Sequence, residues 1–324
     1  MASSNMYSLE PIPGAGLGMV ATVFIPRGTQ ILAEPPLFTL SADFSNPTQL
    51  TAAIEAKVRA LSSDTQRTAF FALHNNYATD RAISAAAGIV KTNAHPLGVG
   101  ARECGLFPEC SRFNHSCASN SSYTWIAATG KETIFAGKDI PAGQQITVNY
   151  LDEHSLLQKR SDRRAAILAL FRFGCGCDVC AGTPAEVAAS DARRVEIARL
   201  DRLIGGGGML VMVSPARCLD SCKQILQLYM DEGMNDDALF KTYNDAFQIC
   251  VMHGDLARAS AFAALAVTCT GAGGPSLESV RPYVEHPERH AYAGMSQKWR
   301  TERRKFRGLD QNGFEKWLWK RADW

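Results

Sequence analysis

The sequence predicts an α+β fold followed by an all-α C-terminal part. Short apolar runs separated by glycine- and proline-containing turns occupy residues 7–40 and return at 121–151, as expected for small β-sheets. Between these regions, apolar residues recur at helical spacing from about residue 47. Beyond residue 183, one amphipathic helical pattern follows another. A β-rich half interrupted by helices and a helical half are therefore expected.

The first strands are predicted from the runs MVATVFI and QILAEPPLFTL, which the turns PGAGLG and PRG separate. Residues 47–87 then take on helical spacing. Strands return in a hairpin that turns at Thr129-Gly130 and in the run QQITVNYL. A helix is expected over residues 156–170, ahead of a cysteine cluster.

The C-terminal part is predicted to contain amphipathic helices over residues 186–204, 216–231, 237–252 and 255–269. The short turn HGD joins the last two, which indicates an antiparallel helical hairpin. Neighbouring helical hairpins are typical of a short helical-repeat domain.

Composition excludes several classes of protein. The chain has 324 residues, with 34 Lys+Arg against 32 Asp+Glu, so its charges nearly cancel and direct binding to nucleic acid is not expected. Apolar content of 46% with 20% charged residues describes a globular protein. No secretory signal or membrane-spanning run is visible, so we expect an intracellular protein of the nucleus or cytoplasm.

Three cysteines in six residues predict a metal site. Cys175, Cys177 and Cys180 form the pattern C-x-C-x-x-C, and ten cysteines in an intracellular chain favour zinc ligation over disulfides. The fourth ligand stays open on spacing alone. Cys117, in a polar loop beside an Asn-His pair, has the most suitable local chemistry, whereas Cys218 and Cys222 are expected to be buried apolar residues of a helix. The other candidates are the histidines and Cys104, Cys110, Cys250 and Cys269.

Three segments occur in order: GAGLGMVAT (14–22), RFNHSCASN (112–120) with QQITVNYLD (144–152), and FRFGCGCDVC (171–180). Together they resemble the SET-domain protein lysine methyltransferases, and among them the SMYD-like branch, over residues 5–182. The resemblance implies a SET-domain β-sheet pseudoknot with inserted helices and a post-SET zinc segment. Such a fold binds S-adenosylmethionine on one face and admits a lysine through a narrow channel from the other.

The resemblance also implies roles for single residues. Tyr150 matches the tyrosine at the transfer site, and Cys117 joins Cys175, Cys177 and Cys180 as the zinc (Zn2+) ligands. Contacts with S-adenosylmethionine are implied for Gly16, Leu17, Gly18, Met19, Asn93, Asn114, His115, Tyr150 and Phe173.

This sequence departs from the family pattern at two positions of the implied channel. Phe171 stands where a second tyrosine is common, which removes a hydroxyl that could bind the incoming amine. His95 stands where a channel-lining phenylalanine is usual, and an imidazole there is expected to titrate near neutral pH. Tyr150, His95 and Phe171 are therefore the residues we expect to govern catalysis. The MYND zinc finger of the SMYD-like branch is absent, because residues 41–92 contain no cysteine.

The expected function is an S-adenosylmethionine-dependent protein lysine N-methyltransferase that acts as a monomer on a histone or another protein carrying the target lysine. Two alternatives stay open: an inactive SET interaction module, and a SET scaffold repurposed for small-molecule chemistry. The expected domains are a SET domain at 1–155 with a helical insertion at about 47–92, a post-SET zinc segment at 156–182, and a C-terminal helical domain at 183–324.

Overall fold

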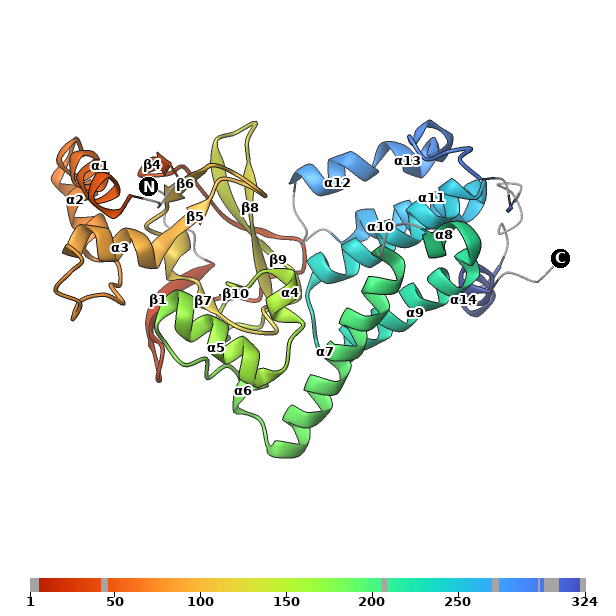
Figure 1. Cartoon of the computed structure of the whole chain (residues 1–324), viewed down its shortest axis with the longest axis horizontal. Helices are drawn as coiled ribbons and strands as arrows, with labels where there is room; N and C mark the ends of the chain where they lie inside the picture. Colours follow the sequence, from red (N-terminus) through yellow and green to blue (C-terminus); the bar gives the residue numbers. More distant parts are fainter. Residues whose placement is uncertain are drawn as a thin grey trace. The chain divides into compact units, whose positions relative to one another are not determined.

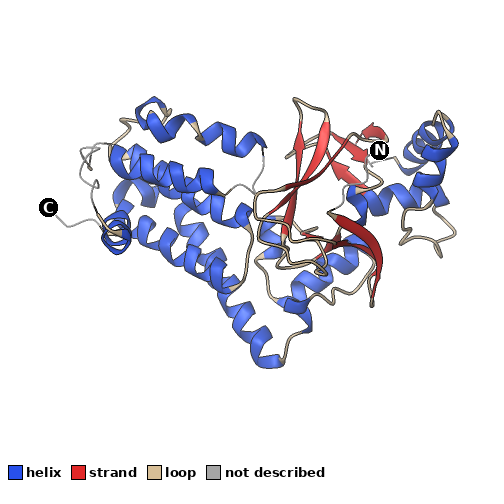
Figure 2. Ribbon diagram, turned by 180° about the vertical axis from the view of Figure 1, so that it is seen from behind, coloured by secondary structure: helices blue, strands red, loops and turns tan. Residues whose placement is uncertain are grey.

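The structure, a computed structural model, describes the chain in residues 6–41, 46–205, 209–269, 274–296, 298–299 and 309–320. One compact unit comprises Met1–Asp152 and Ser161–Ala181, and a second comprises Glu153–Arg160 and Gly182–Trp324. The strands, red in Figure 2, belong to the first unit, and the described part of the second consists of helices and loops. The predicted α+β class is confirmed, whereas the domain boundaries at 155 and 182 stay predictions.

The strands of the first unit form several small sheets (Figure 1). One is the antiparallel hairpin of β1 (Tyr7–Ile12) and β2 (Gly16–Ala21). A second places β9 (Lys131–Ala136) between β3 (Gln30–Glu34) and β8 (Ser121–Ile126). A third places β6 (Glu103–Leu106) between β4 (Phe38–Ser41) and β5 (Ala94–Pro96). The short strands β7 (Asn114–His115) and β10 (Thr147–Val148) pair in parallel.

The predicted β-hairpin is confirmed, because β8 and β9 are antiparallel neighbours joined through Gly130 at φ 63°. The strand expected over QQITVNYL is much shorter than predicted. Only residues 147–148 are β10, because the side chain of Asn120 takes the place of a paired strand. Its Oδ1 accepts a hydrogen bond from the backbone nitrogen of Thr147 at 2.8 Å, and its Nδ2 donates to the carbonyl of Gln145 at 2.9 Å.

The helical insertion lies between β4 and β5 and contains α1 (Pro47–Arg59), α2 (Asp64–Phe71) and α3 (Ala85–Asn93). Each helix begins after a residue whose side chain accepts a hydrogen bond from a backbone N–H of the first turn. These N-cap residues are Asn46, Ser63 and Ser84. The apolar faces of the helices form one core with β4 and β6, centred on Ile54, Phe70 and Val90.

The single helix predicted over residues 156–170 is wrong. The structure has α4 (Glu153–Leu156) and α5 (Arg160–Phe171), followed by α6 (Asp178–Ala181). The break arises because Leu157 is buried in the core of the second unit, and the backbone nitrogen of Arg160 donates to Asp191 at 2.7 Å. Residues 153–160, which include α4, therefore belong to the helical unit, although the sequence on both sides belongs to the first.

The second unit is built on α7 (Pro184–Gly205), α9 (Pro215–Asp231), α10 (Asp236–Met252) and α11 (Leu256–Thr268). These bounds lie within a few residues of the predicted helices, and the turn between α10 and α11 contains Gly254 at φ 76°. Shorter helices complete the unit: α8 (Met209–Val213), α12 (Gly274–Val280), α13 (Pro282–Glu285) and α14 (Gln311–Trp319). Cys218 and Cys222 are buried in its core, as predicted.

Among the described helices, none combines the length and the apolar character needed to cross a membrane.

Candidate active site and metal centre

The glycine-rich turn between β1 and β2 lies against the segment that contains Asn114. Nδ2 of Asn114 donates a hydrogen bond to the backbone carbonyl of Leu17 at 3.1 Å. A Cβ placed on Gly18 would come within 2.6 Å of that same nitrogen, so a larger residue there would displace the Asn114 amide. At Gly16, by contrast, a Cβ would meet nothing within 4 Å, and this part of the turn is open.

Met19 differs from its glycine neighbours, because its side chain is buried in the core of the first unit. Its backbone carbonyl accepts a hydrogen bond from Ile146 at 2.8 Å. Any contact of Met19 with a ligand therefore has to be made through the remaining backbone atoms.

The segment that follows Asn114 wraps around residues 145–148. Strand β7 pairs Asn114 with Thr147 and His115 with Val148. Asn120, which sequence reasoning missed, then bonds to Gln145 and Thr147 through its amide. The only sequence signal for it was the polar run ASN after Cys117, which gives no sign that this amide is buried.

His115 connects the metal cluster to the tyrosine of the site. Its Nδ1 accepts a hydrogen bond from the backbone nitrogen of Tyr150 at 3.0 Å, and its Nε2 lies 3.4 Å from Sγ of Cys117. Because Nδ1 is an acceptor, the neutral imidazole carries its hydrogen on Nε2 and donates it to the sulfur. Both ring nitrogens are therefore engaged within the chain.

Tyr150 stands in a row of aromatic rings. Its ring centroid lies 5.4 Å from that of His115 and 5.1 Å from that of Phe171, and Phe171 lies 6.5 Å from Phe173. The Tyr150 hydroxyl donates to the backbone carbonyl of Phe113 at 2.8 Å. Burial, together with the nearby Tyr123, raises the pKa of Tyr150, so the hydroxyl stays protonated and its direction is fixed.

The position of Phe173 depends on the end of α5. Arg172 adopts the left-handed conformation at φ 58°, which among the described non-glycine residues occurs here alone. Its guanidinium lies over the ring of Tyr77 at 4.2 Å and 3.5 Å from the carboxylate of Asp80. These contacts hold the strained residue that turns the chain from Phe171 to Phe173.

His95 lies between the rings of Phe107 and Tyr123, with centroid distances of 5.8 Å and 5.1 Å. Its Nδ1 is buried and has no hydrogen-bond partner in the described part of the chain. Burial lowers the pKa of His95 to about 4, so the expectation that it titrates near neutral pH is wrong. Tyr123, which sequence reasoning missed, brings a second hydroxyl-bearing ring between His95 and Tyr150.

Asn93 is fixed by its own helix. Its Nδ2 donates to the carbonyls of His74 and Ile89, both at 2.7 Å. The two N–H bonds of the amide are therefore used, and only Oδ1 is left to accept a hydrogen bond from a ligand. Its backbone carbonyl accepts from the hydroxyl of Ser111 at 3.1 Å, which ties α3 to the chain just before Asn114.

Four thiols converge on one point. The sulfur atoms of Cys117, Cys175, Cys177 and Cys180 all lie within 4.8 Å of one another. Sγ of Cys117 and Sγ of Cys180 are 3.7 Å apart, which matches the edge of about 3.8 Å expected for four sulfurs around zinc at about 2.3 Å. The residues present therefore fit a tetrahedral zinc ion. Among the described residues, this is the one group of histidine, cysteine and acidic side chains close enough to hold a metal.

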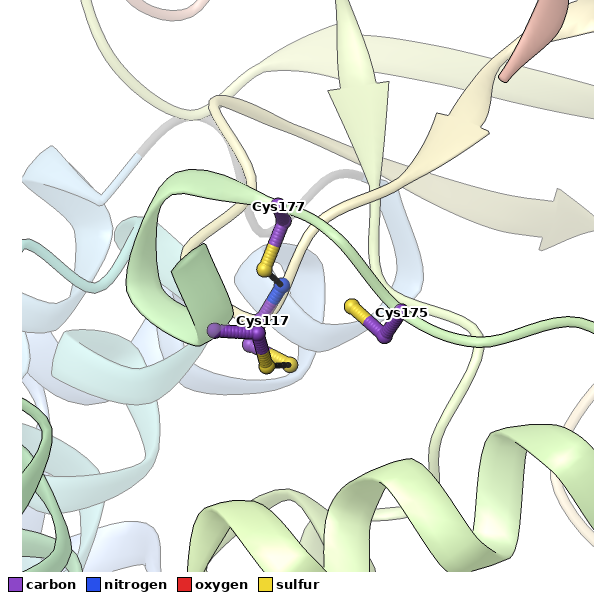
Figure 3. Close-up of side chains that lie close together, drawn as sticks. Cys117, Cys175 and Cys177 are labelled. Carbon is purple, nitrogen blue, oxygen red and sulfur yellow. Dashed lines mark hydrogen bonds between the residues drawn. The ribbon is translucent and has the colours of Figure 1, made fainter. Parts of the chain in front are cut away.

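Cys117 comes from the loop after β7, whereas the other three follow α5. Figure 3 shows the thiol of Cys177 directed at the backbone nitrogen of Cys117, a hydrogen bond of 3.4 Å, and Cys175 approaching from another side. Cys180 lies at α6, where its backbone nitrogen bonds to the carbonyl of Cys177 at 2.8 Å. A metal here would join two segments that are far apart in the sequence.

A fully buried arginine lies against this cluster. Nη2 of Arg163, on α5, lies 3.9 Å from Sγ of Cys180. Burial alone would lower the pKa of Arg163, but the thiols of Cys117 and Cys180 raise it, and the net shift is upward. Four thiolates exceed the charge of one zinc ion, so a guanidinium at this distance offsets part of the excess negative charge.

The sequence was also compared with known proteins, and it is similar to members of one family. A profile of the SET domain matches residues 16–151. The histone-lysine N-methyltransferase set5 of Schizosaccharomyces pombe is 30% identical over 295 residues, which cover 90% of this chain and 87% of the relative. A SET and MYND domain-containing protein of Dictyostelium discoideum is 33% identical over 79 residues, 24% of this chain and 15% of that protein.

Proposed function

Because the chain belongs to the SET-domain family of lysine methyltransferases, we propose that it uses S-adenosylmethionine to methylate a lysine side chain of a protein. The fission-yeast relative is a histone-lysine N-methyltransferase, so a histone lysine is the first substrate we propose. A lysine on another protein is the second. The observation that carries the proposal is the fixed hydroxyl of Tyr150, whose ring lies near that of Phe171 and whose backbone nitrogen bonds to His115.

S-adenosylmethionine, when bound, supplies an electrophilic methyl group on a sulfonium. We propose that it lies along the open face of the β1–β2 turn. The residues proposed to contact it are Gly16, Leu17, Gly18, Asn114, Phe173, Tyr150, the backbones of Met19 and His115, and Oδ1 of Asn93. The open space at Gly16 supports a ligand that approaches the turn backbone closely.

Tyr150 is proposed to orient the reacting groups rather than to remove a proton. Its hydrogen is donated to the carbonyl of Phe113, so the oxygen presents lone pairs to the other side. The raised pKa keeps this hydroxyl protonated at neutral pH, and it cannot serve as a strong base there. Alignment of the amine and exclusion of water are then the main contributions of the protein.

The lysine has to react as a neutral amine, and the rings around Tyr150 favour that form. Phe171 and the nearby Tyr123 offer little solvation to an ammonium, which lowers the pKa of a buried lysine. His95 is uncharged at neutral pH, because its pKa is lowered to about 4, and so it adds no charge that would repel the substrate. Phe171 lacks the hydroxyl of the tyrosine that is common at this position in the family. The hydroxyl of Tyr123 is proposed to supply part of the missing hydrogen bonding to the amine.

The four cysteines are proposed to hold one zinc ion in a structural role. The ion would fasten the segment of Phe173 to the loop after β7, and the Nε2–H of His115 would support the thiolate of Cys117.

The test is methyl transfer from radiolabelled S-adenosylmethionine to histone octamers and to total protein, alongside calorimetric titration of the cofactor. We expect Tyr150→Phe to reduce turnover by about a hundredfold while cofactor affinity stays within about twofold. The control is Val148→Ile, a substitution at a buried residue of β10 that leaves the Tyr150 hydroxyl in place. Absence of cofactor binding would refute the proposal, and unchanged turnover in Tyr150→Phe would remove this residue from the mechanism.

The same assay separates the two alternatives. Cofactor binding without a methylated protein would favour small-molecule chemistry, and a screen of amines would then be the next experiment. Loss of cofactor binding in the intact, zinc-loaded protein would favour an interaction module.

A further inference from the structure

The helical unit contains a cavity of about 380 Å³ that the proposed methyl transfer does not use. Helices α7, α8 and α10 contribute to its walls, together with the loop at residues 292–295 (Figure 1). Its volume lies within the range of sites for small ligands. Most of the lining side chains are apolar: Ile204, Val211, Ile249, Met252, Tyr292 and Met295.

The amide of Gln248 and one carboxylate interrupt this apolar lining. Asp245 lies in the wall of the cavity on α10, and it makes no hydrogen bond or ion pair within the described residues. A partly buried carboxylate without a partner is costly, and such groups are normally paired. The nearest cation on the same helix is already engaged, because Nζ of Lys241 bonds to Glu153 and to Asp201 at 2.8 Å.

Asp245 is partly buried and lies in a region with an excess of negative charge. Burial raises its pKa to about 7, Lys241 opposes the rise, and Asp201 and Glu153 add to it. The carboxylates of these three acidic residues outnumber the one lysine among them. With a pKa of about 7, part of the Asp245 population is protonated at neutral pH, and a positive charge bound beside it would favour the ionised form.

We propose that this cavity binds an alkylammonium or alkylguanidinium group. The charged end lies at Asp245, and the alkyl stem packs against Ile249 and Met252. This is the chemistry of a lysine or arginine side chain on a bound protein, and also of a free polyamine. The cavity is lined by residues of the helical unit and shares none with the proposed methyl-transfer site, so the proposal does not rest on that function.

The methionines in the wall give a direct readout. We would label the full-length protein with ¹³C at the methionine methyl groups and titrate it with n-butylammonium, n-butylguanidinium and, as a neutral control, n-pentanol. The methyl resonances of Met252 and Met295 are expected to shift and saturate with both cations. Asp245→Asn is expected to weaken cation binding by about tenfold or more and to leave pentanol unaffected.

The matched control is Asp220→Asn, at an exposed acid of α9, which should bind the cations normally. Asp245→Asn removes a poorly solvated charge, so it should fold, and a thermal melt checks this. Equal affinity of the cations for Asp245→Asn and for the unsubstituted protein would overturn the proposal. Absence of shifts at Met252 and Met295, or pentanol binding as tightly as butylammonium, would overturn it as well.

Two further titrations distinguish the sources of the group. Acetyl-Leu-Lys-Leu amide represents a side chain on a protein, and cadaverine represents a free amine. Tighter binding of the peptide identifies a protein ligand, tighter binding of cadaverine identifies a free amine, and in both cases the loss in Asp245→Asn must persist. If neither binds, the proposal fails.

Discussion

Each compact unit buries an arginine completely, and the two arginines face different anions. Arg194, in the helical unit, donates from Nε to Glu232 at 2.8 Å and from Nη1 to the carbonyl of Leu156 at 2.8 Å. Arg163, in the first unit, lies against the thiols of Cys117 and Cys180. A carboxylate can carry its charge without a metal, whereas a thiol becomes reliably anionic on binding one. The helical unit thus carries its own counter-charge, whereas the first unit obtains part of its counter-charge when the metal binds.

Removal of the metal should have the largest effect and should act on the first unit alone. We expect about one zinc ion per chain, and its loss by chelation or in Cys175→Ser should cost roughly 5 kcal/mol or more of that unit's unfolding free energy. Differential scanning calorimetry should then show one transition moved to lower temperature and one unchanged. Cys104→Ser, at a buried cysteine outside the cluster, is the control. A metal-free preparation with both transitions intact would contradict this.

The matching change in the helical unit removes the carboxylate that pairs with Arg194. Glu232→Gln leaves Arg194 without its buried carboxylate and weakens the contact with Arg193, whose Nε lies 2.6 Å from Glu232. We expect a loss of about 3–5 kcal/mol from the unfolding free energy of this unit, measured by urea denaturation. Glu196→Gln, at an exposed ion pair, should cost less than about 1 kcal/mol. Zinc content should stay the same, and a fall in zinc would show that the units are coupled.

A buried acid of the first unit should make its stability depend on pH. Both carboxylate oxygens of Glu132 are buried and without a hydrogen-bond partner in the described residues, and burial raises its pKa to about 8. The folded protein therefore favours the protonated form of Glu132. The resulting stabilisation of the folded state is fully present below the ordinary pKa of a glutamate and is lost as pH rises towards 8. Glu132→Gln should remove this loss, so that its unfolding free energy relative to the unsubstituted protein grows by about 4 kcal/mol from pH 5 to pH 8.

Denaturation of both proteins at several pH values measures this difference. Glu103→Gln, at an exposed glutamate of β6, provides the comparison and should show no such growth. A difference that stays constant across the range would mean that Glu132 is solvated or paired in solution.

The smallest expected effect is the one on zinc affinity when Arg163 is replaced. Arg163→Met should weaken zinc retention by about ten- to a hundredfold, because the excess charge of the thiolates is no longer offset, and Arg163→Lys should restore part of it. Competition with a chromophoric chelator measures the affinity. Arg164→Met, at the exposed neighbour on α5, should behave like the unsubstituted protein. Equal zinc affinity in all three variants would make Arg163 a packing residue.

Local patterns in the sequence predicted most elements well. Helix α9 begins one residue before its predicted start and ends where expected, and the β8–β9 hairpin turns at the predicted glycine. These features depend on neighbours in the sequence, such as apolar spacing and turn residues. The break before α5 could not be predicted in this way, because it depends on Leu157 packing in a core built by later residues.

The residues of the candidate site also divide into those that local sequence predicts and those that depend on the fold. The three cysteines after α5 were visible from their spacing, but spacing left the fourth ligand open, because Cys117 lies 63 residues before Cys180 and only its local chemistry and the family resemblance favoured it. Burial explains the remaining differences. The sequence shows that His95 is an imidazole, and only the packing of Phe107 and Tyr123 around it lowers its pKa. Arg163 and Glu132 likewise read as ordinary surface charges until their surroundings are known.

The path of the chain has a consequence for how the protein is made. Residues 153–160 belong to the helical unit but are synthesised before Cys175, Cys177 and Cys180, which complete the first. A ribosome that has reached residue 170 has therefore produced one of the four proposed metal ligands, Cys117, and only residues 153–160 of the helical unit. The first unit therefore stays incomplete until translation passes Ala181, and residues 153–160 wait for their partners in the helical unit until later still.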